Sequence, residues 1–256
     1  MLNESSASAL VEIDKKVNHV RNLLDNVPDD RVDALWRFLD LSSIYHDWAL
    51  EGQVILQEEL SGAFDNRSIT DTTDLPLFTA IRSHKQALVV ARQLAGKRKL
   101  PINVDIFRQF HAYFASDPES AKLGRYRKEI PLHRSYFHEI CHPSKISARM
   151  RKLLAWLNDN GSSANVHPIK WAGEFHFQFM RIFPFIETTG KVGRTMMNMF
   201  LQRQGYFPAI IHATERQRYY ETIRQSQSDF SALLIESELS SLEAAEKFLR
   251  QRSAVA

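Results

Sequence analysis

Residues that interrupt helices are scarce along this chain. Its 256 residues include only 9 glycines and 9 prolines. Over most of its length, apolar side chains recur every three or four positions, which is the spacing of one helix face. These features predict a mostly helical protein that is large enough to bury a sizeable core. We expect helices over residues 8–27, 31–41, 44–60, 76–96, 103–115, 145–159, 169–182, 191–204, 214–226 and 239–251.

One stretch departs from the helical pattern. Residues 124–143 read GRYRKEIPLHRSYFHEICHP, with a rough alternation of apolar and polar side chains, a proline and no helical stripe. This pattern favours an extended or hairpin segment. An isolated hairpin is only marginally stable in water. The segment is therefore either a functional flap that packs on its neighbours or an irregular connecting loop.

Composition and charge argue against several classes of protein. The formal net charge of +3 is too small to predict nucleic-acid binding, and the basic cluster at residues 97–99 is typical of a solvated loop. Cys141 is the single cysteine, so no intrachain disulfide is expected and a reducing compartment is indicated. The N-terminus lacks the apolar core of a secretion signal. No apolar run approaches the roughly 20 residues of a membrane-spanning helix. We expect a cytoplasmic protein without membrane association.

A short loop near residues 184–190 carries the most promising chemistry. Pro184 ends the predicted helix 169–182, and a new helix begins near Lys191. Free backbone N–H groups and the positive end of the helix dipole at that start suit an anion. Lys191 and Arg194 are three residues apart and can both reach such an anion. Glu187 lies beside them and can hold a divalent cation. The alternative is an ordinary helix start.

The sequence around this loop resembles the signature of the Fic (filamentation induced by cAMP) family. In that family a His-Pro-Phe-x-Asp/Glu-Gly-Asn-Gly-Arg-x-x-Arg loop joins two helices. The stretch EFHFQFMRIFPFIETTGKVGRTMMNMFLQRQGYFPAII matches it in register at Pro184, Phe185, Glu187, Gly190 and Arg194. The resemblance implies an all-α, Fic-type helical bundle with a small β-hairpin flap. It assigns nucleotide or phosphate binding to Thr188, Thr189, Gly190, Lys191, Gly193 and Arg194, and metal binding to Glu187.

The resemblance extends over roughly residues 75–237 and sets the expected organisation. We expect N-terminal helices over residues 1–74, a Fic-like core over 75–237 and a C-terminal helix over 238–256, packed as one unit. GRYR at 124–127 resembles the entry to the family's flap, which docks target peptides by strand addition. A protein target docking at the 124–143 flap is therefore the implied partner.

A further match lies N-terminal to the core. SIYHDWALEGQ, residues 43–53, resembles the family's inhibitory helix. By register, the resemblance pairs Glu51 with Arg194 and implies that this pair blocks the productive pose of the ATP γ-phosphate. Asp47 stands where the family has Ser or Thr. The Glu51–Arg194 pair is either regulatory or a structural tie between the N-terminal helices and the core.

The loop departs from the family pattern at four positions. Phe183 replaces the His that serves as general base, and loss of a positioned base lowers the rate by about 10²–10⁴. Thr188 and Thr189 replace Gly-Asn, and β-branched residues resist the positive φ values that Gly and Asn tolerate. Lys191 replaces Arg and loses its bidentate fork. All four changes indicate a degenerate site.

Several histidines are candidate replacements for the missing base. His176 lies on the apolar face of its helix, so a hydrogen-bonded core histidine is expected. His167 precedes Pro168 and is expected at a helix start. The other three lie on the expected flap, where surface positions are expected: His133, His138 and His142.

Three functional hypotheses follow. The first is a catalytically impaired or inactive AMP-transferase homologue, a pseudoenzyme that acts through nucleotide or protein binding. The alternative is an active transferase, held in check by Glu51, that moves AMP or another phosphate-containing group to a protein hydroxyl by altered chemistry. The third is an unrelated helical protein that matches by chance. Mg and ATP are the cofactors that the resemblance implies for the first two.

Overall fold

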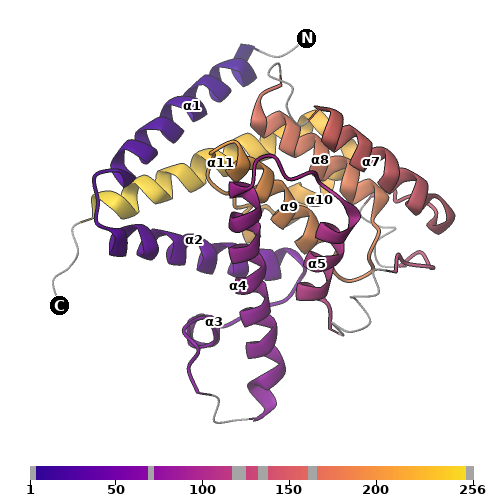
Figure 1. Cartoon of the computed structure of the whole chain (residues 1–256), viewed down its shortest axis with the longest axis horizontal. Coiled ribbons are helices and arrows are strands. Elements are labelled where there is room, and N and C mark those ends of the chain that lie inside the picture. The colour runs from indigo at the N-terminus through magenta and orange to yellow at the C-terminus, as the bar shows by residue number, and fades with distance from the viewer. Residues whose placement is uncertain (1–3, 69–71, 117–124, 132–137, 161–165, 252–256) are drawn as a thin grey trace.

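The computed structural model describes residues 4–68, 72–116, 125–131, 138–160 and 166–251 (Figure 1). Within these ranges the regular structure is entirely helical, which confirms the all-α prediction. The α-helices are α1 Glu4–Leu24, α2 Asp29–Leu50, α3 Gln57–Phe64, α4 Leu75–Gly96, α5 Val104–Phe114, α7 Ile146–Asn160, α8 Pro168–Ile182, α9 Thr189–Arg203, α10 Arg216–Gln225 and α11 Gln227–Arg250.

Helices α8 and α9 form the centre of the molecule. Helix α9 is buried along most of its length, with α8 on one side and α4 and α5 on the other. Helix α11 packs on α8 and is itself covered by α1, so the first and last helices of the chain lie side by side (Figure 1). Helix α2 packs against α4 and α11. The loop between α8 and α9 is thereby held from several directions.

Close contact between α8 and α9 depends on Gly193. A Cβ atom at this position would lie 3.1 Å from the imidazole of His176 and from the ring of Phe179. Both of these side chains are fully buried. Glycine is therefore the residue that lets α9 approach α8 at this point.

Two predicted helix boundaries were wrong. The helices expected over 31–41 and 44–60 are instead one long helix, α2, that ends at Leu50 and is followed by the separate α3. No Gly or Pro separates the two expected helices, and the buried stripe of Leu39 and Ile44 continues across the gap. The C-terminal helix begins at Gln227 rather than 239, because the Ser226 side chain caps it by accepting from the Asp229 backbone N–H. The boundary predicted between residues 237 and 238 thus lies inside α11.

The expected β-hairpin flap is not supported. Its described parts, residues 125–131 and 138–143, contain no strand, while His133 and the rest of 132–137 lie outside the described residues. Two backbone N–H groups in the described parts of this segment bond to the end of α8 and to the loop after it. The Arg127 N–H donates to the Pro184 carbonyl (2.9 Å), and the Cys141 N–H donates to the Arg181 carbonyl (2.9 Å).

None of the helices in the described ranges combines the length and the apolar character that crossing a membrane requires.

Candidate functional site

The α8–α9 loop begins with a left-handed residue. Phe183 ends α8 with φ 50° and ψ 64°, a conformation that is uncommon for a bulky side chain. Its ring is fully buried in the core. Arg127, from a separate segment of the chain, fixes the backbone of Phe183, because the Arg127 Nε–H donates to the Phe183 carbonyl at 2.6 Å. The position that the resemblance assigns to the base therefore carries a buried aromatic ring.

Thr189 closes the loop on itself. Its hydroxyl accepts a hydrogen bond from the Phe185 N–H (2.9 Å) and donates one to the Phe185 carbonyl (2.6 Å). Thr188 has φ −118°, as expected for a β-branched residue that avoids positive φ. The loop backbone is thus fixed by a side chain from within it.

The structure brings Glu51 and Arg194 together. The Arg194 Nη2–H donates to Glu51 Oε1 at 2.9 Å, and both side chains are at least nine-tenths buried. The Glu51 carboxylate lies so close to Gly190 that a Cβ there would overlap with it. A carboxylate from the end of α2 therefore lies against the first turn of α9, where an anion is favoured.

Asp47 is a second carboxylate on Arg194, and the sequence interpretation missed it. The Arg194 Nε–H donates to Asp47 Oδ1, and the Arg194 Nη1–H donates to the Tyr219 hydroxyl (3.1 Å). Burial alone would raise the pKa of Asp47, but Arg194 and His84 outweigh it and lower the pKa to about 2. Burial acts to lower the pKa of Arg194, and Asp47, Tyr219 and Glu51 outweigh it, so that this pKa is raised. Asp47 and Arg194 are both charged.

His84 supports Asp47 from behind. The Trp48 Nε1–H donates to His84 Nδ1 (3.2 Å). The proton of a neutral His84 therefore lies on Nε2, which faces Asp47 Oδ2 at 3.3 Å. Burial lowers the pKa of His84, although Asp47 opposes the shift. A neutral imidazole thus orients the carboxylate.

Lys191 points toward α2. Its Nζ donates to Gln53 Oε1 (3.2 Å) and lies 4.1 Å from the centre of the Trp48 ring. Burial lowers the pKa of Lys191, while Asp47 and Glu51 oppose this shift. With Asp47, Glu51 and Arg194, it makes a buried cluster of two acids and two cations.

A family model described as the Fic/DOC family matches residues 101–201, which include this loop. Over these residues the chain belongs to the Fic/DOC family. Relatives of this Fic chain include proteins named protein adenylyltransferase Fic from Drosophila persimilis and Drosophila willistoni. Each is 26% identical over 188 residues, a match that covers 71% of this chain and 35% or 36% of the relative. The chain spans about a third of the length of these relatives.

Solved Fic structures share the fold. A Fic domain-containing signaling protein from Bacteroides thetaiotaomicron matches with a TM-score of 0.76 and 17% identity, covering 96% of this chain and 100% of that one. Fic-1 from C. elegans matches with a TM-score of 0.73 and 18% identity, covering 93% and 72% of the two chains. These likenesses establish the helical Fic fold.

Glu187, the predicted metal ligand, lies on the exposed side of the α8–α9 loop, residues 183–190, which we call the Fic loop. It accepts a hydrogen bond from the Ser116 hydroxyl at 3.0 Å. Among the described residues, no group of three or more His, Cys, Asp or Glu side chains is arranged to hold a metal ion. Its metal-binding role stays a prediction.

Most histidines lie where the sequence predicted. His176 is fully buried and bonds to the Tyr219 hydroxyl (2.9 Å), and burial lowers its pKa to about 3. His167 caps the start of α8, and His142 is exposed. The surface prediction for His138 was wrong: it is buried, with Nε2 at 2.9 Å from the Met180 carbonyl and its ring against Phe183.

His111 is a loop contact that the sequence interpretation did not identify. It comes from α5, stacks on Phe185 with ring centres 4.0 Å apart, and places Nδ1 2.7 Å from the Thr188 hydroxyl. Burial lowers its pKa to about 4, although Glu187 opposes this shift. No local motif marks it, because the α5–loop contact is formed only in the folded chain.

Proposed function

We propose that this Fic protein binds a phosphate-bearing nucleotide at the start of α9 and has lost efficient nucleotidyl transfer, so that it acts through nucleotide or protein binding. The observation that carries the proposal is the Glu51 carboxylate seated against Gly190 and bonded to Arg194, beside a base position filled by the buried Phe183.

The binding half of the proposal rests on the place that Glu51 takes. An acidic group already lies at the first turn of α9, so a phosphate group would replace it when Glu51 moves away. Lys191 would donate to that phosphate, and Glu187 would hold Mg²⁺ from the exposed side of the loop. A bound Mg²⁺ would neutralise part of the phosphate charge.

The loss of transfer rests on the missing base. The ring of Phe183 cannot accept a proton, and a positioned base contributes about 10²–10⁴ to the rate of such a reaction. The hydroxyl of Thr189 also occupies the Phe185 N–H, which is then not available to a phosphate oxygen. Binding without efficient transfer is the expected combination.

Calorimetric titration of Mg–ATP and of AMP tests binding in the wild-type protein and the Glu51→Gly variant. We expect ligand binding to appear or to tighten at least tenfold in Glu51→Gly. The matched control is Glu58→Gly, which removes an exposed acid from α3. Absence of heat with both ligands in both proteins would refute nucleotide binding at this loop.

Labelled-nucleotide assays test the loss of transfer. We expect no transfer above background from Glu51→Gly, and measurable transfer after the further change Phe183→His if the rest of the loop is competent. Efficient transfer by Glu51→Gly alone would show that the chemistry survives without a base at residue 183.

One observation favours the alternative of an active transferase held in check by Glu51. His111 contacts the Fic loop, and its neutral imidazole would accept a proton. A pKa of about 4 makes it a weak base at neutral pH, so we place this alternative second. If it holds, His111→Ala abolishes the transfer seen in Glu51→Gly and leaves nucleotide affinity unchanged.

Residues 124–143 remain the proposed docking segment for a protein partner. The described contacts that support this are those of Arg127 and Cys141, which fix both flanks of the segment beside the Fic loop. A partner bound there would lie next to Phe183.

A further inference from the structure

We propose that Asp47 is a fixed counter-ion of Arg194 that sets the ligand class of the Fic loop, so that the site accepts a nucleoside monophosphate at least as well as a triphosphate. The inference rests on the proposed function, because it concerns the ligand of the same loop. Glu51 governs access, and Asp47 governs how much negative charge the site accepts.

The guanidinium of Arg194 is used by three partners. Nε donates to Asp47, Nη1 to the Tyr219 hydroxyl, and Nη2 to Glu51 (2.9 Å). Nη2 also lies 3.5 Å from the Asp47 backbone carbonyl. When Glu51 moves away, Nη2 of Arg194 can donate one hydrogen bond to a ligand. The charge of Arg194 stays paired with Asp47.

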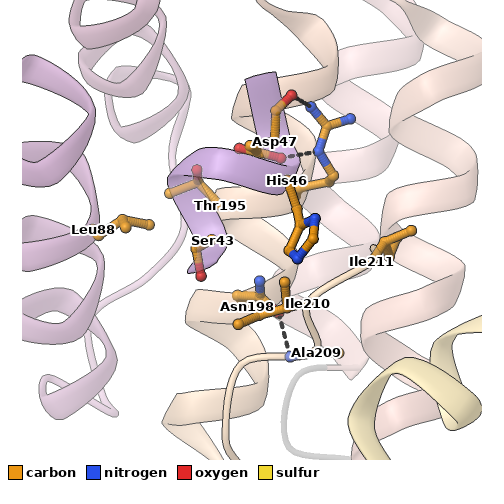
Figure 2. Close-up of a pocket in the computed structure, with 10 residues that line it drawn as sticks. Ser43, His46, Asp47, Leu88, Thr195, Asn198, Ala209, Ile210 and Ile211 are labelled. Atoms are coloured by element: carbon orange, nitrogen blue, oxygen red, sulfur yellow. Dashed lines mark hydrogen bonds and ion pairs between the residues drawn. The ribbon is translucent and has the colours of Figure 1, made fainter. Parts of the chain in front are cut away.

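Asp47 and Glu51 differ in their freedom to move. Asp47 lies inside α2 and points from it toward α9, and dashed lines mark its contacts with a guanidinium (Figure 2). His84 Nε2 lies 3.3 Å from its second oxygen, and the Trp48 Nε1–H donates to the other ring nitrogen of His84. Glu51, by contrast, is the residue at which α2 ends, and Gly52 follows it with φ 83°. The end of the helix can release Glu51 without disturbing Asp47.

The charges decide the ligand class. With Glu51 removed, Lys191 and Arg194 face Asp47 alone, which leaves one net positive charge in the buried cluster. The contacts of the Lys191 ammonium, Gln53 and the Trp48 ring, are not anionic. A monophosphate carries about −1.5 to −2 charges near neutral pH, which is nearer to this balance than a triphosphate. Further phosphates, even with Mg²⁺ neutralising part of their charge, add charge that Arg194 cannot meet while Asp47 holds it. Charge pairs interact strongly where water is excluded.

The experiment measures the affinity of AMP and of Mg–ATP by calorimetry, at one ionic strength, in Glu51→Gly and in Glu51→Gly combined with Asp47→Asn. Asn keeps the shape of Asp and removes its charge. We expect Glu51→Gly to bind AMP at least as tightly as Mg–ATP. We expect Asp47→Asn to tighten Mg–ATP by tenfold or more and AMP by less than threefold.

A matched control removes a different buried acid from the same helix. Asp40, two turns before Asp47, pairs with Arg92 and has no contact with Arg194. Asp40→Asn in the Glu51→Gly background is expected to leave the ratio of the two affinities unchanged. If Asp40→Asn and Asp47→Asn change the ratio of the two affinities equally, the effect is a general one of removing a buried acid. That result would overturn the role of Asp47.

Other outcomes are also decisive. A tenfold preference of Glu51→Gly for Mg–ATP over AMP would overturn the inference and leave the proposed function intact. Equal tightening of both ligands by Asp47→Asn would do the same. Absence of heat with either ligand in every variant would overturn the proposed function and the inference with it. The ratio of the two affinities in Glu51→Gly tests the predicted ligand class even if the Asp47 variant fails to fold.

Discussion

At the scale of single residues, three side chains occupy positions in or beside the Fic loop where a catalytic base or a bound anion would otherwise lie. Phe183 stands at the base position, the Thr189 hydroxyl bonds backbone groups of its own loop, and Glu51 lies where an anion is favoured. Phe183 packs in the core, Thr189 bonds to the loop backbone, and Glu51 contacts the start of α9. The Fic loop is therefore held in place by contacts within the protein.

The contact between Gly190 and Glu51 predicts a coupling between these residues. Gly190→Ala adds a methyl group that overlaps with the Glu51 carboxylate, and we expect it to lower the free energy of unfolding by about 1–3 kcal/mol. In the Glu51→Gly background the loss should shrink, giving a coupling of roughly 0.5–3 kcal/mol. Urea unfolding of the four proteins measures it. An equal loss in both backgrounds would contradict the contact.

Glu238 predicts a pH dependence of stability. Burial raises the pKa of this α11 carboxyl well above its usual value, although the Phe207 backbone N–H opposes the shift. The folded state thus binds the proton more tightly than the unfolded chain does. Its contribution is fully present below the unfolded pKa and is lost as the pH rises through the folded pKa.

The matching variant is Glu238→Gln, which keeps the shape and carries no titratable proton. We expect the stability of the wild-type protein relative to Glu238→Gln to fall as the pH rises from about 5 to about 8, measured by urea unfolding. Glu243→Gln, at an exposed position of α11, is the control. A difference between wild type and Glu238→Gln that is independent of pH would show that Glu238 is not held protonated.

At the scale of elements, α2 and α9 meet end to side, and the last turn of α2 supplies both carboxylates of the cluster. Asp47 and Glu51 are one helical turn apart, so they face the same way, and Arg194 lies between them. Helix α8 supports α9 from the other side through Gly193. The charge cluster thus depends on how closely three helices pack.

Gly193 and Gly96 make a matched pair for testing that packing. A Cβ at Gly193 would press on His176 and Phe179 at 3.1 Å, whereas a Cβ at Gly96 would meet nothing within 4 Å. We expect Gly193→Ala to lower stability by about 1–3 kcal/mol. Gly96→Ala should raise it by up to about 1 kcal/mol, because alanine restricts the unfolded chain. Thermal unfolding distinguishes them, and equal effects would mean that α8 and α9 have room between them.

At the scale of the whole molecule, distant segments converge on one loop. Helix α2, helix α5 and the segment around Arg127 all contact residues 183–194. The guanidinium of Arg127 donates to the carbonyls of Phe183, Glu129 and Cys141. One side chain thus joins both flanks of the 124–143 segment to the Fic loop.

Arg127→Ala should loosen this junction. The change leaves several buried carbonyl groups without a donor, which costs about 1–3 kcal/mol. We expect faster hydrogen exchange at the amides of residues 185–192. Arg125→Ala removes an exposed cation two residues away and serves as the control. Unchanged exchange in Arg127→Ala would mean that the loop holds its shape without this segment.

The sequence predicted the parts of this arrangement that depend on local pattern. Helical periodicity located most helices, and the register of the motif placed Glu51 opposite Arg194. Local sequence pattern could not predict the contacts of His84 with Asp47 and Trp48 or the His111–Thr188 contact, because these join segments that are far apart in sequence. The hairpin prediction failed for a similar reason: alternation favours strand, but the Arg127 and Cys141 backbone groups found partners on α8 and the loop.

The Thr189 hydroxyl, bonded to both backbone groups of Phe185, has a thermodynamic consequence. A loop that is already ordered loses little conformational entropy when a ligand arrives. Ligand binding to the Fic loop would then exchange the Glu51 carboxylate for a phosphate group, without coupled folding. Such an exchange buries little new apolar surface, so the heat capacity of the protein should hardly change on binding.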